Sequence, residues 1–284
     1  MISFIILHYK NISDTVECIE SINKLNDKNI SIIVVDNNTL TKEDEDTLNK
    51  YDIDLIKNDS NLGYAKANNI GASFAIKKYH PSFIAVINND TVIKDKNFTN
   101  IIREDYKKYK FDILGPRIDT NNGESVNPFP VFKTLEEVEE QIKYREKLVK
   151  IYSNPMLNAS LCIYMGLKRV FVKPRHLVNG EHFEENVALH GCAIIFSKKY
   201  YERYKNIFYN ETFLYHEEEF IYQRVLRDKL KSIYDPELSI FHKEGASLNK
   251  SFEFNERKKL IFRNKEIIKS LKLLKKVIEE GKDE

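Results

Sequence analysis

This chain of 284 residues has few cysteines, almost no excess of positive over negative charge, and no long apolar run. Its three cysteines, Cys18, Cys162 and Cys192, lie far apart without metal-ligand spacing, and their odd number is typical of a reducing compartment. No apolar run approaches the roughly 20 residues needed to cross a bilayer, and Ile2–Leu7 is too short for a signal peptide. We therefore expect a cytoplasmic protein, with peripheral contact at the inner face of the plasma membrane as an alternative.

The net charge is only +2, so the overall charge gives no indication of a nucleic-acid partner. Hydrophobic residues make up 42% of the chain and charged residues 31%, as in an ordinary globular protein. The length suits one large α/β domain or two small domains.

Short apolar runs alternate with amphipathic segments along the first hundred residues. This alternation predicts an α/β fold with a mostly parallel sheet and helices on both faces. The expected strands span 2–7, 30–35, 53–57 and 83–87, and the expected helices span 13–25 (capped by Ser13), 41–50 and 63–79. Further along, we expect helices at 135–151 (capped by Thr134), 198–204, 217–229 and 253–280, and strands at 192–196, 232–235 and 238–241.

Polar clusters follow several of these strands. Tyr9 follows the first strand, Asp36 and Asn37 the second, and Asn88-Asn89-Asp90 the fourth. In a parallel sheet the ligand crevice lies at the carboxyl ends of the strands, where these residues are expected. A tyrosine ring can stack on a nucleobase, and Asp36 or Asn37 can accept from a pyrimidine N3–H. An ordinary turn explains Asp36 and Asn37 equally well.

Asp90 is the candidate ligand of a hard divalent cation, Mn²⁺ or Mg²⁺, which takes oxygen ligands and keeps few protein carboxylates. Asn88 or Asn89 could bind sugar hydroxyls or water on the ion. His242, at the end of a predicted strand, could supply a second ligand. Without further context, a turn at 88–90 and a structural role for His242 are the alternatives.

Glu217, Glu218 and Glu219 stand together at the start of a predicted helix. One of them could act as a general base, since crowded carboxylates raise one another's proton affinity. Acidic residues in a first helical turn also interact favourably with the helix dipole, which is the simpler explanation.

Taken in order, these segments resemble the family 2 glycosyltransferases, which are inverting enzymes of the GT-A fold. The resemblance covers most of residues 1–247. The matching segments are IILHY (5–9), VVDNNT (34–39), NLGYAKANN (61–69), NND (88–90) and YNETFLYHEE (209–218), followed by Arg224, His242 and Ser247.

The resemblance implies a GT-A domain over 1–250, with an acceptor-side insertion at 127–185, and a C-terminal amphipathic helix within 251–284. It implies transfer from a UDP- or dTDP-linked sugar to a hydroxyl of a glycan or lipid-linked glycan. The box at 61–69 is similar to enzymes of bacterial surface polysaccharide and capsule synthesis, rhamnosyltransferases among them.

The resemblance also implies roles for individual residues. Asp36 and Asn37 would contact the base, and Asn61 and Asn69 would line the donor pocket. Asp90 and His242 would hold the metal, and Glu218 would be the catalytic base.

Two departures leave questions open. The family's base is usually aspartate, so either Glu217 or Glu218 could reach the hydroxyl here, and Phe220 replaces a second acid. Two other functions remain as alternatives. A sugar nucleotidyltransferase normally needs a glycine-rich loop after the first strand, whereas residues 8–11 contain no glycine. A non-catalytic glycan-binding scaffold could share the architecture.

The tail carries a local excess of positive charge. Residues 256–276 include nine basic and two acidic side chains. Apolar residues recur there at helical spacing: Leu260, Ile267, Ile268, Leu271, Leu274 and Ile278. This apolar face could dock on the rest of the protein, or the basic helix could contact an anionic membrane.

Overall fold

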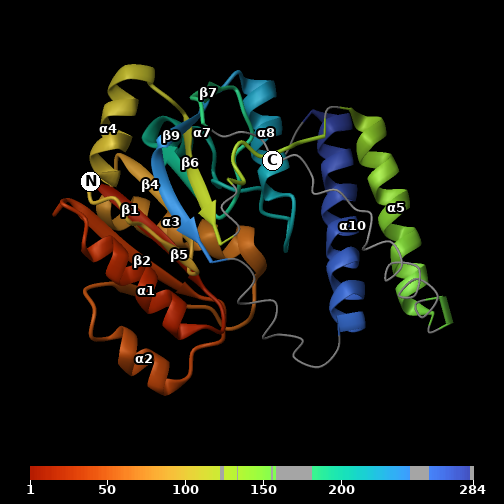
Figure 1. Ribbon diagram of the computed structural model, residues 1–284, viewed down its shortest axis with the longest axis horizontal. Coiled ribbons are helices and arrows are strands. Elements are labelled where there is room, and N and C mark those ends of the chain that lie inside the picture. The colour runs from red at the N-terminus through yellow and green to blue at the C-terminus, as the bar shows by residue number, and fades with distance from the viewer. Residues whose placement is uncertain (122–124, 133, 155, 158–180, 244–255, 282–284) are drawn as a thin grey trace.

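A nine-stranded sheet with helices on both faces forms the body of the protein (Figure 1). Its strand order is β3-β2-β1-β4-β8-β6-β9-β5, and β7 pairs with β9. The computed structural model describes residues 1–121, 125–132, 134–154, 156–157, 181–243 and 256–281.

The strands are β1 (Ile2–His8), β2 (Ile30–Asp36), β3 (Asp54–Lys57), β4 (Phe83–Asn88), β5 (Thr91–Val92), β6 (Ile113–Thr120), β7 (Glu184–Glu185), β8 (Ala193–Ser197) and β9 (Ser232–His242). The helices are α1 (Ile12–Asn23), α2 (Lys42–Leu48), α3 (Gly63–Tyr79), α4 (Phe98–Tyr109), α5 (Leu135–Ser153), α7 (Lys198–Arg203), α8 (Glu217–Asp228) and α10 (Glu256–Glu280).

The first four strands are parallel, as the alternating sequence pattern predicts. In the register, His8 pairs with Asp36 and Leu7 pairs with Asn88. The carboxyl ends of β1, β2 and β4 therefore lie level at one edge of the sheet. The predicted α/β class is confirmed.

The other half of the sheet is mixed. β8 runs antiparallel to β4 and β6, whereas β6 and β9 are parallel. The sequence patterns did not reveal β5, α4 or β6, which lie between the regions that carry motifs.

Two local predictions were wrong. Residues 232–242 form one strand, not two. The ladder with β6 shifts register between Asp235 and Ser239 but continues on both sides of the shift. Pro236, which has no N–H, falls in this irregularity, so a break in pairing looked like the end of a strand. The N-cap of α1 is Asn11, not Ser13. Ser13 instead donates a hydrogen bond to the Asn11 side chain.

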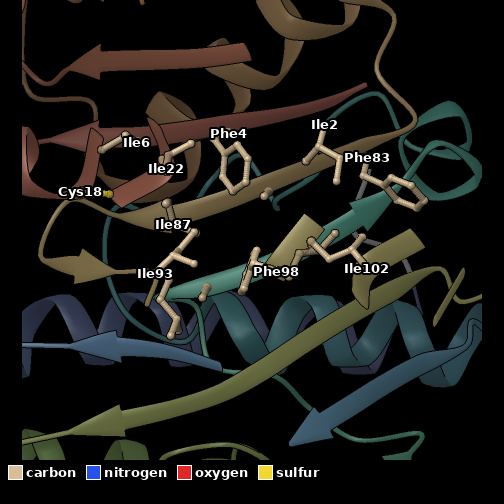
Figure 2. Packing of buried hydrophobic residues seen from close by; sticks show 14 of the residues in the cluster. Ile2, Phe4, Ile6, Cys18, Ile22, Phe83, Ile87, Ile93, Phe98 and Ile102 are labelled. Carbon is tan, nitrogen blue, oxygen red and sulfur yellow. The ribbon is translucent and has the colours of Figure 1, made fainter. Parts of the chain in front are cut away.

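Two apolar clusters cover the two faces of the sheet. Side chains alternate along β1, so Phe4 and Ile6 face α1 and α4 while Ile5 faces α3. Figure 2 shows the first cluster, in which Phe4, Ile22 and Phe98 lie together. Cys18 and Cys192 are buried free thiols.

A third cluster joins α5, α8 and α10 beside the sheet. In Figure 1 α5 and α10 stand as a pair, which agrees with their contacts. The buried members are Val138, Phe220, Ile267, Leu271, Leu274 and Val277. The apolar face of the tail thus docks on the protein, as one of the two alternatives predicted. Helix α5 and its Thr134 cap are also as predicted, while residues 158–180 of the expected insertion lie outside the described part.

No helix in the described ranges is both long enough and apolar enough to cross a membrane.

Candidate functional site

The carboxyl edge of the sheet gathers the ends of β1, β2 and β4 with the start of β8 and the end of β9. Backbone hydrogen bonds fix this arrangement: Asn88 N–H donates to the Cys192 carbonyl at 2.8 Å, and Asn37 N–H donates to the His8 carbonyl at 3.1 Å. Most of the side chains selected from the sequence lie along this edge.

Asp90 and His242 are in direct contact. Nε2 of His242 lies 3.1 Å from Oδ1 of Asp90, and both residues are buried. The antiparallel pairing of Thr91 in β5 with His242 in β9 produces this contact. A second bond, from Lys243 N–H to the Asp90 carbonyl at 3.0 Å, holds the same two segments together.

This pair fits a divalent cation. Two adjacent ligands of an octahedral Mg²⁺ at about 2.1 Å are about 3.0 Å apart, close to the observed separation of the two atoms. Within the ranges that the structure describes, no group of three or more His, Cys, Asp or Glu side chains is arranged to hold a metal. The protein thus offers two ligands here, and phosphate or water oxygens would have to complete the shell.

The three glutamates at the start of α8 lie in different environments. Glu217 and Glu219 are buried, and burial raises the pKa of each to about 8, with the neighbouring Glu218 carboxylate adding to the effect. Both carboxyls therefore retain their protons at neutral pH. Glu218 is half-buried, so it is the most solvent-accessible of the three.

Each of the buried glutamates is held by the protein. The Thr212 side chain and the backbone of Tyr215 lie next to Glu217 and lower the pKa of its carboxyl, against the larger effect of burial. Oε1 of Glu219 accepts from the Phe132 N–H at 3.1 Å. These contacts anchor the start of α8 to its surroundings.

Glu218 is placed by a glycine. Its Oε1 accepts from the Gly191 N–H at 3.0 Å, and a Cβ on Gly191 would lie 2.8 Å from that oxygen. The Tyr64 hydroxyl donates to the Gly191 carbonyl. Residue 191 has to be small so that the Glu218 carboxylate can approach the start of β8.

Phe220 stands where the resemblance led us to expect a second acid. It is fully buried and stacks on Tyr209 with ring centroids 4.5 Å apart. Its cluster packs against α10, so the phenylalanine serves the packing of the C-terminal helix.

Asn37 and Asn61 form a network at the start of α3. Nδ2 of Asn37 donates to Oδ1 of Asn61 at 2.8 Å and to the Gly63 carbonyl at 3.1 Å. Oδ1 of Asn37 accepts from the Leu62 N–H at 2.9 Å. Asn37 is buried and Asn61 is exposed, so Asn61 presents the accessible part of this network.

Asn69 is used as a clamp. Its Oδ1 accepts from the Phe208 N–H at 2.9 Å, and its Nδ2 donates to the Phe208 carbonyl at 3.0 Å. These contacts secure the loop that leads to α8. They favour an indirect role for Asn69, in positioning that loop.

Arg224, which closes the matched block, has a similar role at the two residues that precede Phe208. It is 1% exposed and donates to the carbonyls of Asn206 and Ile207 at 2.8 and 3.1 Å. Ser247 lies outside the described residues.

The remaining donor-side candidates occupy strand ends. Asp36 is buried and accepts from the Thr39 N–H at 2.9 Å, which is the turn geometry expected of its simpler interpretation. Tyr9 and Asn88 are half-buried. Asn89 instead points inward and donates to the Thr15 hydroxyl at 3.0 Å.

The sequence patterns missed His190. Its ring lies 6.3 Å from that of His242, centroid to centroid, and it directly precedes the glycine that holds Glu218. Nδ1 accepts from the Cys192 N–H at 3.1 Å, so in the neutral ring the proton resides on Nε2. The only available signal was a histidine followed by glycine just before the expected strand at 192–196.

Comparisons with known proteins identify the family and the fold. The sequence matches the family described as "Glycosyl transferase family 2" over residues 3–204. It is 24% identical over 206 residues to glycosyltransferase GlyG of Streptococcus pneumoniae serotype 4. The aligned region covers 70% of this chain and 66% of GlyG. This chain thus spans slightly less than two thirds of that relative.

Solved structures share the fold at low sequence identity. TarS 1–349 of S. aureus has a TM-score of 0.52 at 14% identity, over 93% of this chain and 64% of that one. GalNAc-T7 with UDP, GalNAc and Mn²⁺ gives 0.55 at 12%, over 86% and 43%. The mannosyltransferase PcManGT of Pyrobaculum calidifontis with GDP-Man and Mn²⁺ gives 0.52 at 8%, over 94% and 69%.

Proposed function

Because this chain belongs to glycosyl transferase family 2, we propose that it transfers a sugar from a nucleotide-sugar donor to an acceptor hydroxyl, with inversion at the anomeric carbon. The observation that carries the proposal is the contact between Asp90 and His242. Residues 190–192 connect this pair to Glu218, through the neighbouring rings of His190 and His242 and the Gly191 hydrogen bond.

Asp90 and His242 are the residues that would hold Mn²⁺ or Mg²⁺. When bound there, a divalent cation supplies positive charge that stabilises the negative charge developing on the leaving diphosphate. Both side chains are buried, so the surrounding protein limits the screening of this charge by water.

Glu218 is the proposed base. It takes the proton from the acceptor hydroxyl, whose oxygen then attacks the anomeric carbon opposite the diphosphate in a single displacement. Glu217 is less suitable, because its carboxyl is buried and protonated at neutral pH.

On the donor side, Tyr9 would stack on the base, and Asp36 and Asn37 would bind it through their strand-end positions. Asn61 and Asn88 are the exposed and half-buried amides available to the donor, while Asn69 would act by holding the loop before α8. We propose a UDP- or dTDP-linked hexose or deoxyhexose such as rhamnose. The fold is compatible with either base, since TarS binds UDP and PcManGT binds GDP-Man, so the pyrimidine rests on the strand-end residues Asp36 and Asn37.

The proposed acceptor is a glycan or lipid-linked glycan of bacterial polysaccharide synthesis, encountered in the cytoplasm. Contact of α10 with the inner membrane surface would have to use its exposed lysines, because Ile267, Leu271 and Leu274 already pack against the protein. Sedimentation with anionic phospholipid vesicles tests this part: retention in the supernatant at low salt would rule it out.

A donor-hydrolysis assay tests the function. Slow release of nucleoside diphosphate from UDP-, dTDP- and GDP-sugars is measured with Mn²⁺ and with EDTA. Manganese-dependent release from at least one donor is the expected result. No release from any common donor would instead favour a non-catalytic glycan-binding scaffold.

A further inference from the structure

A groove of about 750 Å³ lies between the loop before α8 and the C-terminal helix α10. Glu211 and Phe213 line it on the loop side. Helix α10 contributes Phe262, Glu266 and Leu273. The volume is within the range of about 300–1,000 Å³ typical of small-molecule sites.

The loop wall of the groove leads directly into the acidic start of α8. Thr212, between the two loop residues that line the groove, is buried and donates to the Tyr209 carbonyl at 3.2 Å. Its side chain lies close enough to Glu217 to lower the pKa of that carboxyl, against the larger effect of burial. The groove wall is therefore packed against the neighbour of Glu218.

The same wall also contacts the donor side. The Phe213 carbonyl accepts from the Tyr64 N–H at 2.7 Å, and Gly63 packs so closely that a Cβ there would lie 2.3 Å from that carbonyl oxygen. Helix α10 is joined to the loop by the Ser270 hydroxyl, which donates to the Leu214 carbonyl at 2.9 Å. Both sides of the groove are therefore held in place relative to the site.

The lining indicates an uncharged ligand. Lys269 pairs with Glu266 at 2.6 Å, and Lys272, which also borders the groove, pairs with Glu146 at 2.8 Å. Glu211 adds a carboxylate, so the lining has no excess positive charge to attract a phosphate or carboxylate ligand.

The aromatic side chains indicate which uncharged ligand fits. Phe213 and Phe262 are half-buried, and a phenylalanine face is electronegative. The C–H groups on one face of a sugar ring carry partial positive charge and pack on such a surface, while carboxylates such as Glu211 accept from the hydroxyls. Aromatic rings combined with acidic side chains therefore suit a neutral saccharide.

We propose that this groove is the acceptor subsite and that it binds an uncharged saccharide, whose reactive hydroxyl is directed towards Glu218. The assignment rests on the proposed transferase function. It gives α10 a role in acceptor recognition in addition to packing.

The test measures saccharide binding and donor hydrolysis separately. Ligand-observed NMR follows the methyl β-glycosides of glucose, galactose, N-acetylglucosamine and rhamnose, with glycerol phosphate as an anionic probe. The variants are Phe262→Ala, Phe262→Tyr, which keeps an aromatic face, and Lys265→Ala, an exposed control on α10 outside the groove lining. Circular dichroism checks that each variant is folded.

We expect at least one neutral glycoside to bind, about tenfold more weakly in Phe262→Ala and with unchanged affinity in the other two variants. Donor hydrolysis should be unchanged in Lys265→Ala, the control outside the groove. Equal binding by Phe262→Ala, binding of none of the glycosides, or displacement of the glycoside by glycerol phosphate would overturn the assignment. Absence of donor hydrolysis in the wild-type protein would instead overturn the transferase function, whatever the NMR result.

Discussion

Nε2 of His242 and Oδ1 of Asp90 lie 3.1 Å apart although 152 positions separate the two residues in the chain. The pairing of β5 with β9 creates this contact at the edge where the parallel strands end. Nδ1 of His242 is buried and finds no hydrogen-bond partner among the described residues. The histidine therefore has its main polar contact on the side that faces Asp90, which makes this pair the centre of the proposed site.

Replacing Asp90 with asparagine should weaken metal-dependent binding of the nucleotide. The side chain keeps its size but loses the charge that attracts a hard cation. We expect the affinity for UDP in the presence of Mn²⁺ to fall by about tenfold or more, as measured by calorimetry. Asp46→Asn, at an exposed position on α2, is the matched control. Equal manganese dependence in both variants would argue against a metal at Asp90.

Glu218→Gln and Glu217→Gln should differ in turnover. An amide at position 218 cannot take a proton, so transfer should fall by about 10²- to 10⁴-fold while UDP binding persists. An amide at 217 replaces a carboxyl that burial already keeps protonated, with its pKa raised to about 8. Activity of that variant should therefore stay near the wild-type level. Full activity of Glu218→Gln would place the base elsewhere.

Gly191→Ala tests the placement of Glu218 without changing the carboxylate. The new Cβ would lie 2.8 Å from Oε1 and displace it. A misplacement of about 1 Å can reduce turnover by about 10²-fold, so a large loss of kcat is expected. Gly281→Ala, where a Cβ meets no atom within 4 Å, should leave kcat unchanged. Comparable kcat values for the two variants would contradict this account of Gly191.

Asp105 should make stability depend on pH. Burial, followed by the nearby Asp235 carboxylate, raises its pKa from the usual 3.8 to about 7. The folded state thus holds this proton more tightly than the unfolded state. The stabilisation is full below about pH 4 and is lost as the pH rises through about 7.

The Asp105→Asn variant has no such proton. Its melting temperature, relative to that of the wild type, should increase between pH 4 and pH 8 in thermal denaturation scans. A constant difference across this range would show that Asp105 titrates normally.

Leu271→Ala should destabilise the whole protein, since Leu271 is fully buried between α10 and its neighbours. Loss of a buried leucine typically costs about 2–5 kcal/mol of unfolding free energy. Urea titration measures this cost, with the exposed Lys276→Ala as control. A cost below about 0.5 kcal/mol would show that α10 is not part of the folded core.

The parallel half of the sheet could be predicted from local sequence patterns. Apolar runs alternating with helical segments indicated β1 to β4 and α3. A parallel sheet is buried on both faces, so its strands are continuous apolar runs and the helices that cover it are amphipathic. The same patterns also identified which polar residues follow those strands, since a strand end is visible locally as the change from Val35 to Asp36 or from Ile87 to Asn88.

Contacts between segments that are distant in the chain could not be predicted in this way. His190 comes close to His242, and Glu218 becomes distinct from Glu217, because α8, β8 and β9 pack together; no local pattern encodes their relative placement. The same holds for α10. Its periodic apolar face was equally compatible with a membrane surface, and only the presence of α5 and Phe220 beside it shows which apolar partner it buries.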